Sequence, residues 1–357
     1  MADLSIQRIL DGLVPPFTIK DETSIASKLS ERMETLHIPG ASVAVIHDGK
    51  IQWARGFGVA AMAGPKVTPE TLFQAASLSK PVTAMALLRL AQEGKLELDA
   101  DVNKYLKTWK VPENNFVVNV KVTLRELLNH TGGTTVQGFP GYASCEPVPS
   151  LIQVLNGEKP ANTEAITVDM EPGKIWRYSG GGYVVLQQLL EDVTGVPFPQ
   201  FLQDKVFSSI GMKHSAFEQP LSPNRMAEAA MPHDSIGRPI PGGPHTYPEL
   251  AAAGLWTTPS DLCLFALEVQ KSLAGTTNQV LSAIMTKEML KPGSWKWGLG
   301  FQVGLGNGHP YFVHNGINAG YQNMLATYNS GDGAVLMTNG DNGLQLAKEI
   351  FGTFNLE

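Results

Sequence analysis

The sequence predicts an α+β fold in which both ends of the chain form one antiparallel β-sheet flanked by helices, with a mainly helical subdomain inserted between its strands. Strand-like segments bounded by turn residues cluster near both termini, whereas residues 77–290 carry helical patterns and long polar or proline-rich connections. Strands and helices do not alternate as they do around a parallel sheet. We expect a single domain over residues 1–357, with an α/β subdomain (residues 1–76 and 291–357) and a mainly helical subdomain (residues 77–290).

The N-terminal elements follow from two periodicities. Residues 1–37 are expected to be helical, because apolar residues recur at helical spacing at Ile25, Leu29, Met33 and Leu36. The period then changes. Residues 41–47 and 51–57 are typical of strands, and the Asp48-Gly49 pair between them is a strong signal for a two-residue hairpin.

The remaining elements lie on either side of the proposed insertion. A helix is expected over residues 81–94, with Pro81 in the first turn and Gly94 as the stop. Near the C-terminus, the sequence predicts strands and then a helix, over residues 299–303, 311–313, 321–328, 334–338 and 344–354. A ligand is expected in the crevice between the two subdomains. The loop over residues 238–248 lies near it, either as an ordered connection or as a mobile lid.

Composition narrows the possible partners and the compartment. The chain is 43% hydrophobic and 17% charged, with a formal net charge of −6 and no basic run, which argues against nucleic-acid binding. No segment has the apolar length of a membrane span, and residues 1–8 do not resemble a secretory signal. With only Cys145 and Cys263, the pattern is typical of a reducing compartment, so we expect a cytoplasmic protein. The eight histidines lack metal-ligand spacing, so neither a metal nor a cofactor is expected.

The most informative chemical signal is the tetrad from Ser77 to Lys80. Side chains three residues apart share a helix face, so the Ser77 hydroxyl and the Lys80 amine would point into the same space. A serine becomes nucleophilic when a neighbouring base takes its proton, and a lysine can do this if burial keeps it partly neutral. Placed before the helix of residues 81–94, Ser77 would also benefit from unpaired backbone donors at the helix start.

Other segments of the chain strengthen the prediction that this tetrad is catalytic. Residues 176–183 (WRYSGGGY) precede a helical run, and residues 313–321 (VHNGINAGY) begin a strand. Together with residues 127–133 and 253–261, they make the chain resemble the serine β-lactamase and penicillin-binding-protein superfamily, whose Ser-x-x-Lys is followed by a Tyr-x-Asn or Ser-x-Asn motif and a Lys-Thr-Gly-type strand. The resemblance is closest to the class C branch and the family VIII carboxylesterases, and covers nearly the whole chain.

The resemblance implies a role for each matching residue. Ser77 matches the acylated nucleophile, Lys80 the partner that accepts or relays its proton, and Tyr178 the tyrosine that acts as general base and then protonates the leaving group. Which of Lys80 and Tyr178 is the primary base stays open at the level of sequence, so the two are treated as one coupled unit.

Two motif positions depart from the lactamase pattern. His314 replaces the lysine of the third motif, while Gly316 is retained and would let the strand approach the substrate. The N–H groups of Ser77 and Ile317 are then the expected oxyanion donors, each worth about 3 kcal/mol of the barrier. Gly180 stands where the superfamily has an asparagine that holds an amide carbonyl.

These departures favour a serine carboxylesterase that cleaves small esters through an acyl-Ser77 intermediate. The alternatives are a β-lactamase, D-amino-acid peptidase or amidase with the same mechanism, and a binding module that has lost catalysis. His314, Gly316, Gly180 and Trp256 are the expected substrate-binding positions. Other aromatic residues in connections could line the pocket or pack in the core, namely Phe139, Tyr142, Tyr247, Trp295 and Trp297. The sequence does not indicate an oligomeric state.

Overall fold

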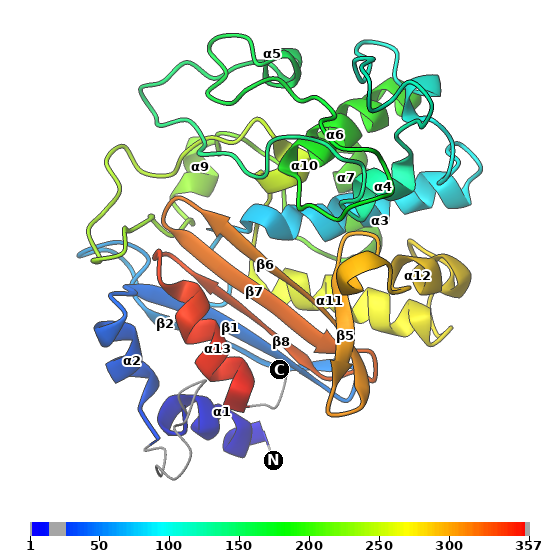
Figure 1. Cartoon of the computed structure of the whole chain (residues 1–357). Coiled ribbons are helices and arrows are strands. Elements are labelled where there is room, and N and C mark those ends of the chain that lie inside the picture. Colours follow the sequence, from blue (N-terminus) through cyan, green and yellow to red (C-terminus); the bar gives the residue numbers. More distant parts are fainter. Residues whose placement is uncertain (1, 14–25, 354–357) are drawn as a thin grey trace.

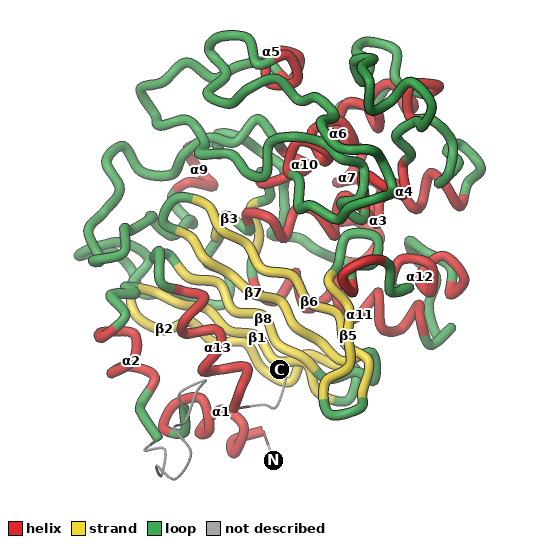
Figure 2. The backbone as a smooth tube through the Cα atoms, in the orientation of Figure 1, coloured by secondary structure: helices red, strands yellow, loops and turns green. Residues whose placement is uncertain are grey.

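Both ends of the chain contribute strands to one six-stranded antiparallel sheet, as Figures 1 and 2 show. The computed structural model describes residues 2–13 and 26–353. The strand order is β2-β1-β8-β7-β6-β5, so that an N-terminal strand, β1, lies beside the last strand, β8. The strands are β1 (Gly40–His47), β2 (Lys50–Gly58), β5 (Gln302–Gly306), β6 (His309–Asn318), β7 (Tyr321–Tyr328) and β8 (Gly333–Thr338). The predicted fold class is confirmed.

The first hairpin forms as its sequence indicates. His47 pairs with Lys50, and the two residues between them, Asp48 and Gly49, have φ values of 53° and 67°. Positive φ at both central positions is the property of a type I′ turn, whose twist matches that of the flanking strands.

The apolar run of β1 reflects burial on both faces of the sheet. Ala41, Val43 and Val45 belong to one hydrophobic cluster, whereas Ala44 and Ile46 belong to another on the opposite face. A strand covered on both sides needs no polar alternation, which explains its continuous apolar sequence.

One face of the sheet is covered by helices from both termini. These are α1 (Ala2–Asp11), α2 (Leu29–Thr35) and α13 (Gly343–Thr353), which lie together in Figure 1. The expectation that residues 1–37 are helical throughout was wrong, because Leu13 and Ser27 form a short antiparallel bridge between α1 and α2. Leu29, Met33 and Leu36 are buried as expected, and Ile25 lies outside the described residues.

The second hydrophobic cluster joins the other face of the sheet to the helical part of the molecule. Helix α11 (Pro259–Leu273) packs against β1, β2 and β8 there. A short sheet of β3 (Phe73–Gln74) and β4 (Trp256–Thr257) lies apart from the large one. The remaining α-helices are α3 (Ser79–Gln92), α4 (Leu124–Leu128), α5 (Leu151–Asn156), α6 (Gly180–Thr194), α7 (Phe198–Leu202), α8 (Ser208–Ile210), α9 (Pro223–Met226), α10 (Leu250–Ala253) and α12 (Ala283–Met289). The division at residues 77 and 290 stays a prediction.

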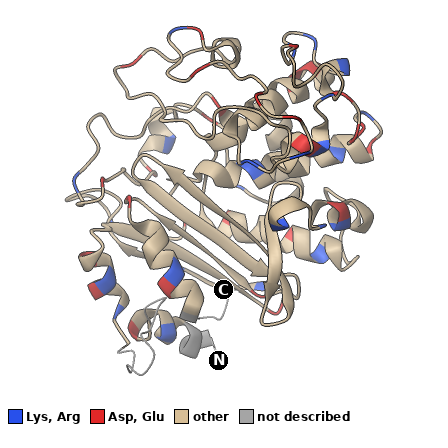
Figure 3. Ribbon diagram, viewed as in Figure 1, with Lys and Arg blue, Asp and Glu red and all other residues tan. Residues whose placement is uncertain are grey.

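Charged residues are distributed without a dominant sign in the view of Figure 3. Lysine and arginine are interspersed with aspartate and glutamate over the helices and loops, while the broad sheet carries few of either. Within residues 2–13 and 26–353, no helix has both the length and the apolar character needed to cross a bilayer. Both cysteines are free, with Cys145 exposed and Cys263 buried.

Candidate active site

Ser77 lies in a single 3₁₀ turn, η1 (Ala76–Leu78), that leads directly into α3. The chain arrives from β3, and the Ala75 N–H is held by the carbonyl of Leu255 at 2.8 Å. Ala76 has a φ of 53°, a left-handed conformation that costs energy in a residue with a Cβ. This local strain sits next to Ser77, which is the partly exposed member of an otherwise buried segment.

Lys80 reaches Ser77 from the first turn of α3. Its Nζ lies 3.1 Å from Ser77 Oγ and 2.8 Å from the carbonyl oxygen of Ala252 in α10. The side chain is only 2% exposed, and the rings of Tyr178 and Tyr183 lie 5.0 and 5.6 Å from its amine. Burial disfavours the ammonium form and lowers the pKa of Lys80 to about 7.

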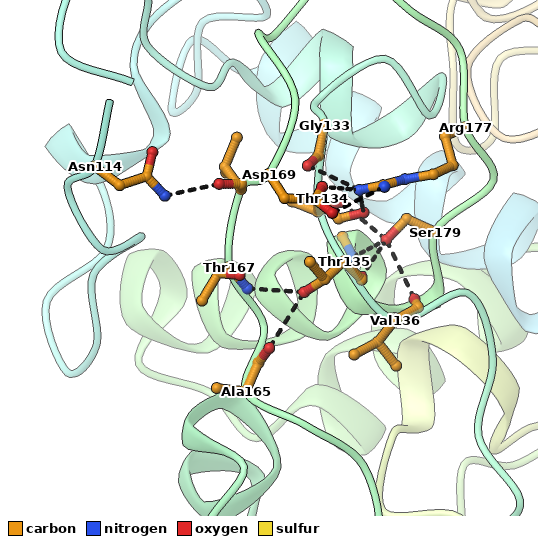
Figure 4. Close-up of polar contacts among 12 residues, drawn as sticks. Asn114, Gly133, Thr134, Thr135, Val136, Ala165, Thr167, Asp169, Arg177 and Ser179 are labelled. Carbon is orange, nitrogen blue, oxygen red and sulfur yellow. Dashed lines mark hydrogen bonds and ion pairs between the residues drawn. The ribbon is translucent and has the colours of Figure 1, made fainter. Parts of the chain in front are cut away.

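Tyr178 is held by its two sequence neighbours, which are both fixed to residues 133–136. Arg177 binds Asp169 and donates to the carbonyls of Gly133 and Thr134, as Figure 4 shows. On the other side, Ser179 Oγ donates to the carbonyl of Thr135 at 2.9 Å.

The same Ser179 hydroxyl begins the helix that follows Tyr178. Its Oγ accepts a hydrogen bond from the Gly182 N–H at 3.0 Å and so caps the N-terminus of α6. These contacts fix the backbone on both sides of Tyr178 and so define where its side chain can point.

The Tyr178 phenol interacts with Ser77, and the Lys80 amine lies 3.1 Å from Ser77 Oγ and 5.0 Å from the centre of the Tyr178 ring, so the three predicted catalytic groups converge. Burial raises the pKa of Tyr178 far above its ordinary value, although the Ser77 contact lowers it slightly. The phenol is therefore protonated at neutral pH. The three groups lie close together, and their catalytic roles stay predictions.

His130, which sequence reasoning did not single out, packs beneath Tyr178. The two rings are 4.4 Å apart, and His130 adopts a left-handed φ of 63° just after α4. Its Nδ1 accepts a hydrogen bond from the Ser179 N–H at 3.2 Å, which places the ring proton on Nε2. Burial, and then the charge of Lys80, hold the pKa of His130 well below its usual value, so the ring is neutral. Its position inside the motif of residues 127–133 was the one available signal.

Strand β6 approaches the η1 turn that carries Ser77, and the contact is made through Gly316. A Cβ at this position would lie 2.1 Å from the carbonyl oxygen of Ala75, so only glycine permits the observed contact. Residues of β6 beyond Val313 have no partner in β5, which leaves this end of the strand as an edge beside η1. Ile317 lies on that edge, and its N–H as an oxyanion donor stays a prediction.

His314 lies on β6 with its ring 6.2 Å from that of Tyr178. Its Nδ1 donates to the carbonyl of Asn315 at 2.5 Å, so Nε2 carries the free lone pair and has no partner among the described residues. Burial, followed by the charge of Lys80, lowers the pKa of His314 to about 3. The position of the lactamase lysine is thus occupied by a neutral side chain.

Gly180 occupies the first turn of α6 in a place where a side chain has no room. A Cβ would lie 2.9 Å from the Phe139 ring and 3.0 Å from the Gln137 carbonyl oxygen. The half-buried ring of Phe139 fills the space next to this backbone. No amide side chain can project from this position without displacing Phe139.

A cavity of about 420 Å³ opens beside Tyr178, between the sheet and the helical part of the chain. Trp176, Tyr178 and Trp297 form one side, with ring centroids of Trp297 at 5.3 and 5.9 Å from those of Trp176 and Tyr178. The other side comes from strands β5, β6 and β7, including Tyr311 and His314. A cavity between the two parts of the fold agrees with the expected crevice.

Other aromatic candidates lie elsewhere. Trp256, expected at the substrate, is 1% exposed and packs against Tyr321 in the core, outside the cavity lining. Tyr142 and Tyr247 are also buried, whereas Trp295 is 74% exposed. Among the aromatic loop residues expected to line a pocket or pack in the core, Trp297 is the one in the cavity wall.

Acidic and metal-ligating side chains do not gather at the site. Within residues 2–13 and 26–353, no group of three or more His, Cys, Asp or Glu residues lies close enough to hold a metal ion. The expectation of no metal and no cofactor stays a prediction.

Comparison with known proteins supplies the family. The Beta-lactamase family model matches residues 25–351. Protein flp of Staphylococcus aureus (strain MW2) is 29% identical over 259 residues, 70% of this chain and 48% of flp. The putative penicillin-binding protein PbpX of Bacillus subtilis (strain 168) is 24% identical over 313 residues, 87% of this chain and 72% of PbpX. The chain thus spans about half the length of the staphylococcal relative.

Solved structures share the fold at low sequence identity. An octameric penicillin-binding protein homologue from Pyrococcus abyssi has a TM-score of 0.75 and 23% identity, and the match covers 91% of this chain and 74% of that one. The D-amino acid amidase from Ochrobactrum anthropi SV3 has a TM-score of 0.72 and 19% identity, over 99% of this chain and 98% of the amidase. These likenesses show the shared architecture.

Proposed function

The chain belongs to the Beta-lactamase family, and from that premise we propose that it is a serine carboxylesterase that cleaves small carboxylic esters through an acyl-Ser77 intermediate. Within the family we place it with the family VIII carboxylesterases related to class C. The observation that carries the proposal is a pair of features: Ser77, Lys80 and Tyr178 lie close together, while positions 180 and 314 offer no amide and no charge to an amide substrate.

Acylation begins with removal of the Ser77 proton. Near neutral pH a substantial fraction of Lys80 is an uncharged amine 3.1 Å from Ser77 Oγ, whereas Tyr178 is fully protonated. A base is most effective when its pKa lies near the working pH. We therefore assign Lys80 as the base that accepts the proton while Oγ attacks the ester carbonyl. The N–H groups of Ser77 and Ile317 would stabilise the oxyanion.

Tyr178 completes the proton transfers. As the ester C–O bond breaks, its hydroxyl donates a proton to the leaving alkoxide and recovers one from the Lys80 ammonium, whose Nζ lies 5.0 Å from the centre of its ring. Water then attacks the acyl-Ser77 ester, with the same groups acting in reverse, and releases the acid. An alkoxide is a better leaving group than an amine, so this step demands less of the site for an ester.

The two altered positions support ester over amide hydrolysis. The ring of Phe139 closes the space beside Gly180 from which an asparagine would hold an amide carbonyl. A neutral His314 gives no fixed positive charge for the carboxylate of a β-lactam. The competing function is a β-lactamase, D-amino-acid peptidase or amidase using the same three groups, and a D-amino acid amidase is among the proteins that share the fold.

A comparison of kcat/KM between ester, lactam and peptide substrates tests the proposal. We expect p-nitrophenyl acetate and butyrate to give a burst and a higher kcat/KM than nitrocefin or a D-Ala-D-Ala peptide, and Ser77→Ala to abolish ester turnover. Higher kcat/KM for the lactam or the peptide would favour the competing function. Equal ester turnover by wild type and Ser77→Ala would refute the acyl-enzyme.

Ser79→Ala is the matched control for the nucleophile. The Ser79 hydroxyl donates to the Ala76 carbonyl at 2.6 Å and accepts from the Leu255 N–H at 3.0 Å, so it is committed to structure. We expect this variant to lose some stability and to retain the burst.

A further inference from the structure

We propose that the cavity beside Tyr178 binds the alcohol part of the ester and selects uncharged aromatic alcohols. This inference rests on the esterase function proposed above and adds the side of the substrate that the cavity holds and the chemistry it favours.

The position of Tyr178 identifies the side. Its hydroxyl interacts with Ser77, whose Oγ lies 3.1 Å from Lys80 Nζ, and its ring forms part of the cavity wall. The leaving oxygen must come within hydrogen-bond distance of the hydroxyl that protonates it. The group attached to that oxygen is therefore directed along the Tyr178 ring and into the cavity, while the acyl carbon stays at Ser77.

The walls are suited to a flat ring. Trp176, Tyr178 and Trp297 are contiguous, and Tyr311 on β6 faces the same space. The planes of Trp297 and Tyr178 meet at 75°, so a ring in the cavity can make face and edge contacts with different walls. The volume of about 420 Å³ lies within the range of small-molecule pockets.

The residues that line the cavity disfavour an alcohol part that carries a charge. Among the described residues that line the cavity, none is Lys, Arg, Asp or Glu, and His314 is neutral. An anionic group would find no counter-charge there. A cationic group, such as choline, would be attracted by the aromatic faces but has no acidic partner among these lining residues.

The test uses three acetate esters that differ only in the alcohol: benzyl acetate, cyclohexylmethyl acetate and acetylcholine. All three form the same acetyl-Ser77, so differences in kcat/KM report on how the alcohol part is bound during acylation. We expect benzyl acetate to exceed cyclohexylmethyl acetate about three- to tenfold, the range that aromatic contacts supply, and acetylcholine to be the poorest substrate.

Substitutions in the cavity wall make the assignment specific. In Trp176→Leu and Tyr311→Leu we expect the benzyl preference to fall to about twofold or less, because benzyl acetate loses more kcat/KM than cyclohexylmethyl acetate does. Phe116→Leu is the control, because Phe116 is 44% exposed and does not line the cavity, and it should keep the wild-type ratio.

The outcomes separate this inference from the function on which it rests. Equal kcat/KM for benzyl and cyclohexylmethyl acetate, or preference for acetylcholine, would overturn the inference and leave the esterase intact. A second pair of substrates, the methyl esters of phenylacetic and cyclohexylacetic acid, varies the acyl group instead. If Trp176→Leu changes the kcat/KM ratio of this pair but not the ratio of the benzyl and cyclohexylmethyl acetates, the acyl group occupies the cavity and the inference is overturned. If no ester is hydrolysed, or hydrolysis survives Ser77→Ala, the proposed function fails and the inference fails with it.

Discussion

Lys80 is the residue on which the proposed mechanism depends. A lysine amine is ordinarily protonated at neutral pH, and here burial among apolar residues of α3 and the rings of Tyr178 and Tyr183 brings its pKa to about 7. Two hydrogen-bond partners, Ser77 Oγ and the Ala252 carbonyl, keep it in place in either protonation state. The fold thus places an amine of lowered pKa beside Ser77, which is what the proposed role of Lys80 as base requires.

The pH dependence of activity follows from the protonation state of Lys80. Only the neutral amine can accept the Ser77 proton, so kcat/KM for an ester should rise as Lys80 loses its proton, with a midpoint near pH 7 and a plateau at higher pH. Stopped-flow acylation with p-nitrophenyl butyrate from pH 5 to 9 measures this. Lys80→Arg should be inactive across the range, because guanidinium stays charged. A flat profile in the wild type would contradict the role of Lys80.

Replacing Tyr178 by phenylalanine should cost more with poor leaving groups than with good ones. The raised pKa keeps the phenol protonated, which suits it to donate a proton to the departing alkoxide. General acid catalysis typically contributes about 10²- to 10⁴-fold. We expect a loss of that order with ethyl butyrate and a clearly smaller one with p-nitrophenyl butyrate, measured as kcat/KM. Equal losses would indicate that Tyr178 acts before the leaving group departs.

At the scale of elements, the site depends on how closely β6 packs on the turn that carries Ser77. The strained φ of Ala76 turns the chain from β3 into α3, and the missing side chain of Gly316 lets the edge of β6 lie against Ala75. Neither element alone forms the site. The distance between them determines whether the N–H groups of Ser77 and Ile317 can serve one oxyanion.

Gly316→Ala should therefore separate β6 from η1. An added Cβ would meet the Ala75 carbonyl oxygen at 2.1 Å, and backbone must move to relieve it. We expect kcat to fall about 10²-fold or more, the cost of losing one oxyanion donor, with KM less affected. Gly138→Ala is the control, since a Cβ there meets nothing within 4 Å. Wild-type kcat in Gly316→Ala would show that the close approach is dispensable.

Short sequence patterns predicted the turns and strands that form through interactions between residues close in the chain. The Asp48-Gly49 turn and strand β7 follow the sequence closely, because turn residues and side-chain alternation act over a few positions. The break between α1 and α2 was missed, since helical spacing says nothing of the bridge between Leu13 and Ser27.

Three sequence motifs predicted that Ser77, Lys80 and Tyr178 would lie together. The residues that surround them could be identified only from the fold. His130 beneath Tyr178, and Tyr311 in the cavity wall, are brought there by packing between segments far apart in sequence. Trp256 shows the converse error, because an aromatic residue in a connection can equally be a core residue. The pattern of apolar residues in a sequence predicts which side chains are buried and whether a segment is a helix or a strand. It does not predict which buried surfaces pack against each other.

At the scale of the whole molecule, the two ends of the chain must come together before the site can exist. The sheet joins β1 and β2 to the C-terminal strands, and α2 lies beside α13 on its outer face (Figure 1). Arg32 of α2 makes two parallel hydrogen bonds to Glu349 of α13, at 2.7 and 2.8 Å. This pair connects residues 317 positions apart in the chain.

Breaking that connection should destabilise the whole protein. Glu349 is 5% exposed, so Arg32→Ala leaves a buried carboxylate without its guanidinium partner. We expect the free energy of unfolding to fall by about 1–3 kcal/mol, measured by urea denaturation. Arg238→Ala removes an ion pair whose arginine is 72% exposed and should change stability by less than about 0.5 kcal/mol. Equal effects of the two variants would contradict this assignment.

The central claim is that Ser77 carries the acyl group, and mass spectrometry of the intact protein tests it most directly. After brief exposure to a fluorophosphonate, and separately to p-nitrophenyl butyrate quenched in acid, we expect one adduct per chain, mapped by fragmentation to Ser77 and not to Ser79, and absent in Ser77→Ala. A penicillin should label the protein far more slowly. An adduct on another residue, or labelling that persists in Ser77→Ala, would contradict the account.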